Sequence, residues 1–115
     1  MRTIISGGRD YQMTTADYAF LDTLKSRITE VVSGGAKGAD EGGERWANKN
    51  GIPVKLFPAN WDRNGAAAGP IRNRKMAKYA QALVVFPGGN GTFNMEMEAE
   101  RRNLKIIYCP KRSRY

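Results

Sequence analysis

Hydrophobic residues occur in short continuous runs that alternate with longer stretches of helical spacing. Five of the runs have the composition of β-strands, at residues 3–6, 30–33, 53–57, 82–86 and 105–109. The run at 82–86 is apolar throughout, which is expected of a parallel strand covered on both faces. Between the runs, apolar residues recur at intervals of three and four, which predicts four helices. These helices are expected over residues 15–28, 39–49, 70–81 and 92–103.

Capping and loop signals between these elements support their boundaries. Thr14 is followed three residues later by Asp17, a capping-box signature at a helix start. Residues 58–69 contain no predicted element, and loops of this length are often functional. Strands that alternate with helices in this way predict one α/β domain with a doubly wound parallel sheet.

Glycines cluster in three of the four turns that lead from a strand into a helix. The three turns are Ser6-Gly7-Gly8-Arg9, Ser33-Gly34-Gly35-Ala36-Lys37-Gly38 and Pro87-Gly88-Gly89-Asn90-Gly91-Thr92. Right-handed crossovers place such turns on one edge of the sheet, where ligands of these folds bind. Glycine permits close approach to the main chain, and helix N-termini attract anions. We therefore expect the turns to bind phosphate, with simple tight turns as the alternative explanation.

Charged and aromatic side chains flank these turns. Arg9, Lys37, Arg72 and Arg74 are candidate phosphate ligands, although a solvated face is the better interpretation of Arg74, Lys75 and Lys78. Asp10, Asp40 and Glu96 are the carboxylates that could contact ribose or transfer a proton. Trp61, in the long loop, could stack on a base or pack in the interior.

Composition narrows the chemistry. The chain of 115 residues has no histidine and one cysteine, which excludes histidine-dependent nucleophile systems, a disulfide framework and a multi-cysteine zinc site. We expect no metal site and no cofactor. The formal net charge is +8, which fits nucleic acid, a small anionic ligand or simple solubility equally well. Lys111, Arg112 and Arg114 belong to a basic C-terminal tail, residues 111–115.

No apolar run is long enough for a membrane span or a signal-peptide core. The expectation is a soluble, cytoplasmic protein with no membrane partner.

Four ordered motifs carry a resemblance to a known family. They are residues 33–40 (SGGAKGAD), 58–62 (PANWD), 68–76 (AGPIRNRKM) and 86–92 (FPGGNGT). Together they resemble the YspA-type family of the SLOG superfamily, which is often found in bacteriophages and mobile elements. If the protein is encoded by a phage, it would act in the bacterial host cell. The resemblance implies a Rossmann-like sheet of order 3-2-1-4-5. It also implies that residues 1–110 form a domain that binds a nucleotide or a nucleotide-derived small molecule.

Two relatives within the superfamily imply different activities. The turn at 87–92, with Arg72 and Met76 before it, is similar to the LOG enzymes, usually dimers that release the base from nucleoside 5′-monophosphates with an arginine and a glutamate. Met95 stands at the position of that glutamate, and Glu96 lies about 100° further around the helix. Catalysis by Arg72 with Asp40 or Glu96 therefore remains a hypothesis, as does a homodimer.

The second relative is DprA, a protein that binds single-stranded DNA and has a turn that resembles residues 33–40. Single-stranded nucleic acid is therefore the alternative partner.

In the favoured hypothesis, which is nucleotide binding, the turns at 34–38 and 88–92 present backbone amides to phosphate, and Arg72 pairs with the phosphate. Asn73 orders the site, and Asp40 contacts ribose or a catalytic water.

Overall fold

Five parallel strands form a single sheet in the order β3-β2-β1-β4-β5 in the computed structural model, which describes residues 1–111. The strands are β1 (Arg2–Ser6), β2 (Glu30–Ser33), β3 (Val54–Leu56), β4 (Ala82–Val85) and β5 (Lys105–Tyr108). This architecture confirms the predicted Rossmann-like α/β fold and its strand order.

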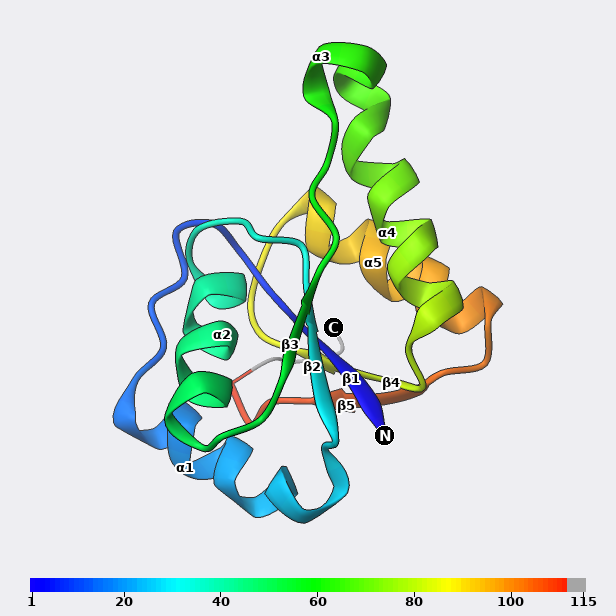
Figure 1. Cartoon of the computed structure of the whole chain (residues 1–115). Helices are drawn as coiled ribbons and strands as arrows, with labels where there is room; N and C mark the ends of the chain where they lie inside the picture. Colours follow the sequence, from blue (N-terminus) through cyan, green and yellow to red (C-terminus); the bar gives the residue numbers. More distant parts are fainter. Residues whose placement is uncertain (112–115) are drawn as a thin grey trace.

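Helices cover both faces of the sheet (Figure 1). The helices are α1 (Thr15–Leu24), α2 (Ala39–Lys49), α3 (Trp61–Asn64), α4 (Ala68–Tyr79) and α5 (Asn90–Arg101), with short 3₁₀ turns at Lys25–Arg27 and Gly65–Ala67. Helices α1 and α2 pack on one face, and α4 and α5 pack on the other. None of the helices in residues 1–111 is long and apolar enough to cross a membrane.

The core consists of two layers, one on each side of the sheet. Along the central strand β1, Ile5 packs toward Leu21 and Trp46 of the first layer, whereas Ile4 packs toward Met76 and other residues of the second. All four residues of β4 are buried, because this strand too is covered on both faces. The continuous apolar run predicted this burial correctly.

The segment between β3 and α4 has more structure than its sequence predicts. Residues 58–69, expected as a loop, contain α3, a 3₁₀ turn and the start of α4. The side chain of Asn60 caps α3 by accepting from the Arg63 amide at 3.0 Å. Helix α4 begins two residues before Pro70, which lies in its first turn, where the missing N–H costs no hydrogen bond.

The first helix is capped as predicted but is shorter. Thr14 and Asp17 form both hydrogen bonds of the capping box. The α-helix ends at Leu24 rather than Ile28, because the chain tightens into the 3₁₀ turn. Lys111 of the predicted basic tail lies beside this helix start, with its Nζ 2.9 Å from Thr14 Oγ1 and 3.5 Å from Asp17 Oδ2. Arg112 and Arg114 lie outside the described residues.

The order in which the chain adds strands to the sheet reverses between β1 and β4, two neighbouring parallel strands. The connection after β1 passes to α1 on one face, and the connection after β4 passes to α5 on the other. Ligands of doubly wound sheets bind in the crevice at such a switch point, beyond the carboxyl ends of the strands. Helix α3 and the first turn of α4 stand beyond this same edge (Figure 1).

Candidate functional site

Two adjoining cavities open at the carboxyl edge of the sheet. The first lobe, of about 440 Å³, is lined by residues 6–9 of the turn after β1, by the start of α5 and by the start of α4. The second lobe, of about 590 Å³, is lined by the turn after β2 and by residues that follow β3. Arg9, Ala36, Trp61 and Arg72 line both lobes, so the two cavities form one continuous cleft.

The three glycine turns touch one another beneath this cleft. The Gly8 amide donates to the Pro87 carbonyl at 2.8 Å, and the Gly8 carbonyl accepts from the Ala39 amide at 3.2 Å. A Cβ at Gly88 would lie 2.7 Å from the Gly8 nitrogen, and a Cβ at Gly38 would collide with the Gly8 oxygen. Gly38 and Gly88 therefore allow the backbones of neighbouring turns to pack closely. This structural role is nearer to the alternative explanation of the glycines, tight turns, than to phosphate binding.

Glycines at the start of α5 have open space instead. A Cβ at Gly89 or Gly91 would meet no atom within 4 Å, and residues 89–92 all line the first lobe. No side chain caps this helix end. The first N–H groups of a helix have no partner within it, and the helix dipole adds positive potential there. The start of α5 can therefore receive an anionic group in the first lobe.

The turn after β2 uses its own amides internally. The Gly35 amide donates to Ser33 Oγ at 3.1 Å, and the Ala36 amide donates to Asp40 Oδ2 at 3.3 Å. Ser33 in turn donates its hydroxyl proton to Glu44 at 2.6 Å. These bonds fix the shape of the turn and occupy the amides of Gly35 and Ala36, which the sequence hypothesis assigned to phosphate. The charged side chain of Lys37 is exposed and open to a ligand instead.

Arg72 lies at the boundary of the two lobes. Its Nη1 donates to the Gly34 carbonyl at 2.7 Å, and its Nε donates to Asn73 Oδ1 at 2.9 Å. Gly34 permits this contact, because a Cβ there would collide with the guanidinium. Burial lowers the pKa of Arg72, and Asp40 opposes that shift. A guanidinium in this position presents its remaining N–H donors to the cleft.

Asn73 links two elements of the cleft wall by hydrogen bonds. Its buried Nδ2 donates to Asn94 Oδ1 at 2.9 Å and to the Gly91 carbonyl at 3.4 Å. These bonds tie α4 to the first turn of α5. Asn94, which lines the first lobe, was missed by the sequence hypothesis. Its spacing of four residues from Asn90 on a helix was the available signal.

Asp40 is a buried carboxyl group in the first lobe. Burial raises its pKa from 3.8 to about 6, while the Ala36 amide and the Arg72 charge act in the opposite direction. A group with such a pKa changes protonation near neutral pH and can exchange protons with a ligand or water. Asp40 therefore remains the best-placed candidate for acid–base chemistry.

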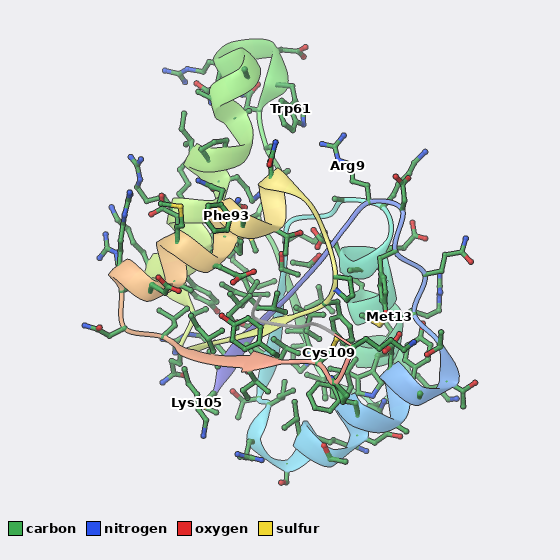
Figure 2. The ribbon with its side chains drawn as sticks, turned by 180° about the vertical axis from the view of Figure 1, so that it is seen from behind. Arg9, Met13, Trp61, Phe93, Lys105 and Cys109 are labelled. Carbon is green, nitrogen blue, oxygen red and sulfur yellow. The ribbon has the colours of Figure 1, made fainter. Side chains whose placement is uncertain are left out.

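Arg9 and Trp61 face each other across the cleft mouth. The Arg9 guanidinium carbon lies 5.8 Å from the centre of the Trp61 ring, within cation–π distance. The Trp61 side chain is 49% exposed, and Figure 2 shows both residues at the open edge of the molecule. Of the two alternatives for Trp61, the structure favours an accessible stacking surface over interior packing.

Several predicted site residues do not line either lobe. Ser33, Gly38, Pro87 and Gly88 shape the turns, and Asp10 lines a neighbouring cavity with Gly38. Glu96 is buried on α5, where it accepts a hydrogen bond from the Tyr108 hydroxyl at 3.2 Å. Its position on the helix carries it away from the cleft, as its angular offset indicated.

The residues beside Glu96 divide between interior and surface. Met95 packs in the second core layer and so cannot replace a catalytic glutamate. Met97 and Phe93 are exposed, and Phe93 projects from α5 in Figure 2. Arg74, Lys75 and Lys78 face solvent, as predicted.

Comparison with known proteins identifies the family. The family model described as YspA, cpYpsA-related SLOG matches residues 1–64. The Gene 61 protein of Mycobacterium phage D29 is 34% identical over 117 aligned positions, which cover 92% of this chain and 94% of that protein. The chain belongs to the YspA, cpYpsA-related SLOG family.

The fold of this SLOG protein also occurs in a solved structure. The DNA processing protein A (DprA) of Streptococcus pneumoniae superposes with a TM-score of 0.79, at 18% sequence identity. The match covers 95% of this chain but only 50% of that one. The SLOG protein thus spans about half the length of DprA, and the likeness establishes the shared fold.

Proposed function

We propose that the protein binds a nucleotide or a nucleotide-derived small molecule, with a phosphate group in the first lobe. The observation that carries the proposal is the uncapped start of α5, which lines this lobe with Gly89 and Gly91 open to it. Arg72 lines the same lobe and supplies a fixed positive charge. Backbone amides and a guanidinium around one cavity suit a phosphate dianion.

Trp61 and Asp40 would bind the rest of the nucleotide. Both line the first lobe, Trp61 at the exposed rim and Asp40 in the interior. A base stacked on the indole would take the place of the Arg9 guanidinium, and the carboxylate would accept from ribose hydroxyls. Aromatic stacking of a base contributes about 1–3 kcal/mol.

Native mass spectrometry tests this function with a panel of probes. The panel contains nucleoside monophosphates, NAD, ADP-ribose, cyclic nucleotides and a short single-stranded oligonucleotide. We expect a retained small nucleotide, whose mass identifies it, and the same spectrum distinguishes monomer from homodimer. Retention of the oligonucleotide alone would contradict the proposal.

Hydrolysis of an N-glycosidic bond is a second candidate function. It is favoured by the buried Asp40, which lines the first lobe with its pKa raised to about 6. A carboxylate can stabilise the oxocarbenium-like transition state of such a reaction or activate water. The test is chromatography for free base and ribose 5-phosphate after incubation with AMP. Product formation that persists in Asp40→Asn would exclude this role for Asp40.

Single-stranded DNA is the alternative ligand. Arg9, Lys37 and Arg72 line the second lobe, and the shared fold with a protein named for DNA processing favours testing it. Contacts to a phosphate backbone release counterions, so DNA affinity should fall steeply as salt increases. A nucleotide held by helix amides and one arginine should depend on salt far less. A salt titration with oligonucleotide and AMP separates the two functions.

A further inference from the structure

The second lobe has a chemistry of its own. It carries three cations, Arg9, Lys37 and Arg72, and its lining residues include no aspartate or glutamate. The first lobe, in contrast, contains the Asp40 carboxyl group. The second lobe is therefore suited to an anion, and it is larger than a phosphate group requires.

Apolar residues line the same lobe as these cations. Leu56, on the edge strand β3, is 52% exposed and lines the second lobe together with Pro58 and Ala59. Exposed leucine at the wall of a cationic cavity offers a face for a sugar or base, while the cations hold an adjacent phosphate. A combination of apolar lining and a few placed polar groups is typical of small-molecule sites.

The junction between the lobes carries two cations, Arg9 and Arg72. Arg72 is anchored there by its bond to the Gly34 carbonyl, and Arg9 approaches it from the turn after β1. Burial lowers the pKa of Arg72, and the nearby positive charge of Arg9 repels the guanidinium and lowers this pKa further. A phosphate placed between them would relieve this repulsion.

We infer that the cleft takes a ligand of two linked units, with a phosphate linkage at the Arg9–Arg72 junction and the second nucleoside or sugar in the second lobe. This inference rests on the proposed function, because the first unit occupies the first lobe. Lys37 would bind the second unit, and Leu56 would pack against its ring. Two sources share this chemistry, pyrophosphate-linked compounds such as ADP-ribose and phosphodiester-linked dinucleotides such as pApA.

Isothermal titration calorimetry with AMP, ADP-ribose and pApA tests the inference. At least one of the two-unit probes should bind about tenfold more tightly than AMP, the gain expected from an added charged contact. Lys37→Ala and Leu56→Gln should remove most of this gain but change AMP affinity by less than about twofold. Lys105→Ala, an exposed lysine at the opposite edge of the sheet (Figure 2), is the matched control and should change neither.

The outcomes separate this inference from the proposed function. Equal affinity for AMP and both two-unit probes would overturn the inference and leave the nucleotide site intact. Loss of AMP affinity in Lys37→Ala, equal to the loss for ADP-ribose and pApA, would also overturn it. Absence of binding by all three probes would overturn both proposals. Preference for ADP-ribose or for pApA identifies the linkage that the junction accepts.

Discussion

The Arg72 guanidinium donates to the Gly34 carbonyl at 2.7 Å and so joins helix α4 to the turn after β2, 38 residues earlier in the chain. The contact depends on glycine at position 34, where any Cβ would collide with the guanidinium. It also holds Arg72 at the junction of the two lobes. A flexible side chain is thereby fixed before a ligand arrives, which reduces the entropy lost on binding.

Replacement of Arg72 should weaken ligand binding much more than folding. Arg72→Ala is expected to lose about 1.5–3 kcal/mol of AMP affinity, the range for hydrogen bonds to a charged group. Stability should fall by no more than about 1 kcal/mol, because water in the open cleft can replace the lost bonds. Calorimetry and thermal unfolding measure the two effects.

Arg74→Ala is the matched control for that variant. Arg74 lies on the same helix, and its exposed side chain faces Glu98 rather than the cleft. Its removal changes the net charge equally and should leave AMP affinity within about twofold, since Arg74 lines neither lobe of the cleft. Equal losses in the two variants would show that only the overall charge matters.

A side chain at Gly89 should block the phosphate position without disturbing the fold. Gly89→Val places its side chain in open space at the start of α5, so we expect a normal melting temperature and no detectable AMP binding. Gly88→Ala should instead lower the melting temperature, since its Cβ would collide with Thr92 and the Gly8 backbone. Circular dichroism and calorimetry on both variants make the comparison. Normal AMP affinity in Gly89→Val would contradict phosphate binding at this helix end.

Trp61 should report ligand binding by its fluorescence. Of the two tryptophans, Trp46 is buried with its indole N–H bonded to Asp22, whereas Trp61 is exposed at the cleft mouth. A base stacked on Trp61 should quench its emission, and Trp61→Phe should lose the response while Trp46 still fluoresces. Trp61→Ala should cost about 1–3 kcal/mol of affinity, the usual contribution of base stacking. A ligand response that survives in Trp61→Phe would remove this residue from the site.

Asp40 should make folding stability fall as pH rises. Its pKa is about 6 in the folded protein and 3.8 in the unfolded chain, so the folded state binds the proton more tightly. Stability is therefore lost as pH increases from about 4 to about 6. Asp40→Asn removes the buried charge and should be more stable than the original protein at pH 8, by about 1–3 kcal/mol. Urea unfolding at pH 4 and pH 8 measures the difference, which should be small at pH 4.

The exposed Asp10 provides the control for this pH dependence. Asp10→Asn removes a carboxylate at the surface beside the same cleft, and it should change stability by less than about 0.5 kcal/mol at either pH. If Asp40→Asn instead destabilises the protein equally at both pH values, its carboxylate acts through hydrogen bonding to Ala36 rather than through a buried charge.

The elements that the sequence predicted are those determined by local patterns. The Thr14–Asp17 capping box and the apolar run of β4 both depend on residues close in the chain, and both are confirmed. The offset of Glu96 from the catalytic position of the LOG enzymes combined helical geometry with the family resemblance, and the structure removes Glu96 from the candidate catalytic residues. Strand order was available only through the family resemblance, since spacing does not say which strands pair.

Features that depend on distant backbone contacts were not predictable in detail. Nothing local distinguishes Gly88, which packs against Gly8, from Gly89, which is open to the cleft. The helix at Trp61 was missed because its cap is one asparagine and its length is four residues. The proximity of Arg9 to Trp61 likewise arises only when the turn after β1 folds against α3.

The contacts among Gly8, Gly38 and Gly88 distinguish the floor of the cleft, where substitutions would disturb the fold, from the walls, where side chains can be substituted. The floor is made by main chain packed on main chain, and a side chain at Gly38 or Gly88 would separate the turns. Arg9, Lys37, Leu56 and Trp61, in contrast, are exposed at the walls and can be exchanged without disturbing the floor. Related proteins could therefore change the walls of the cleft while they keep the same packed turns beneath it.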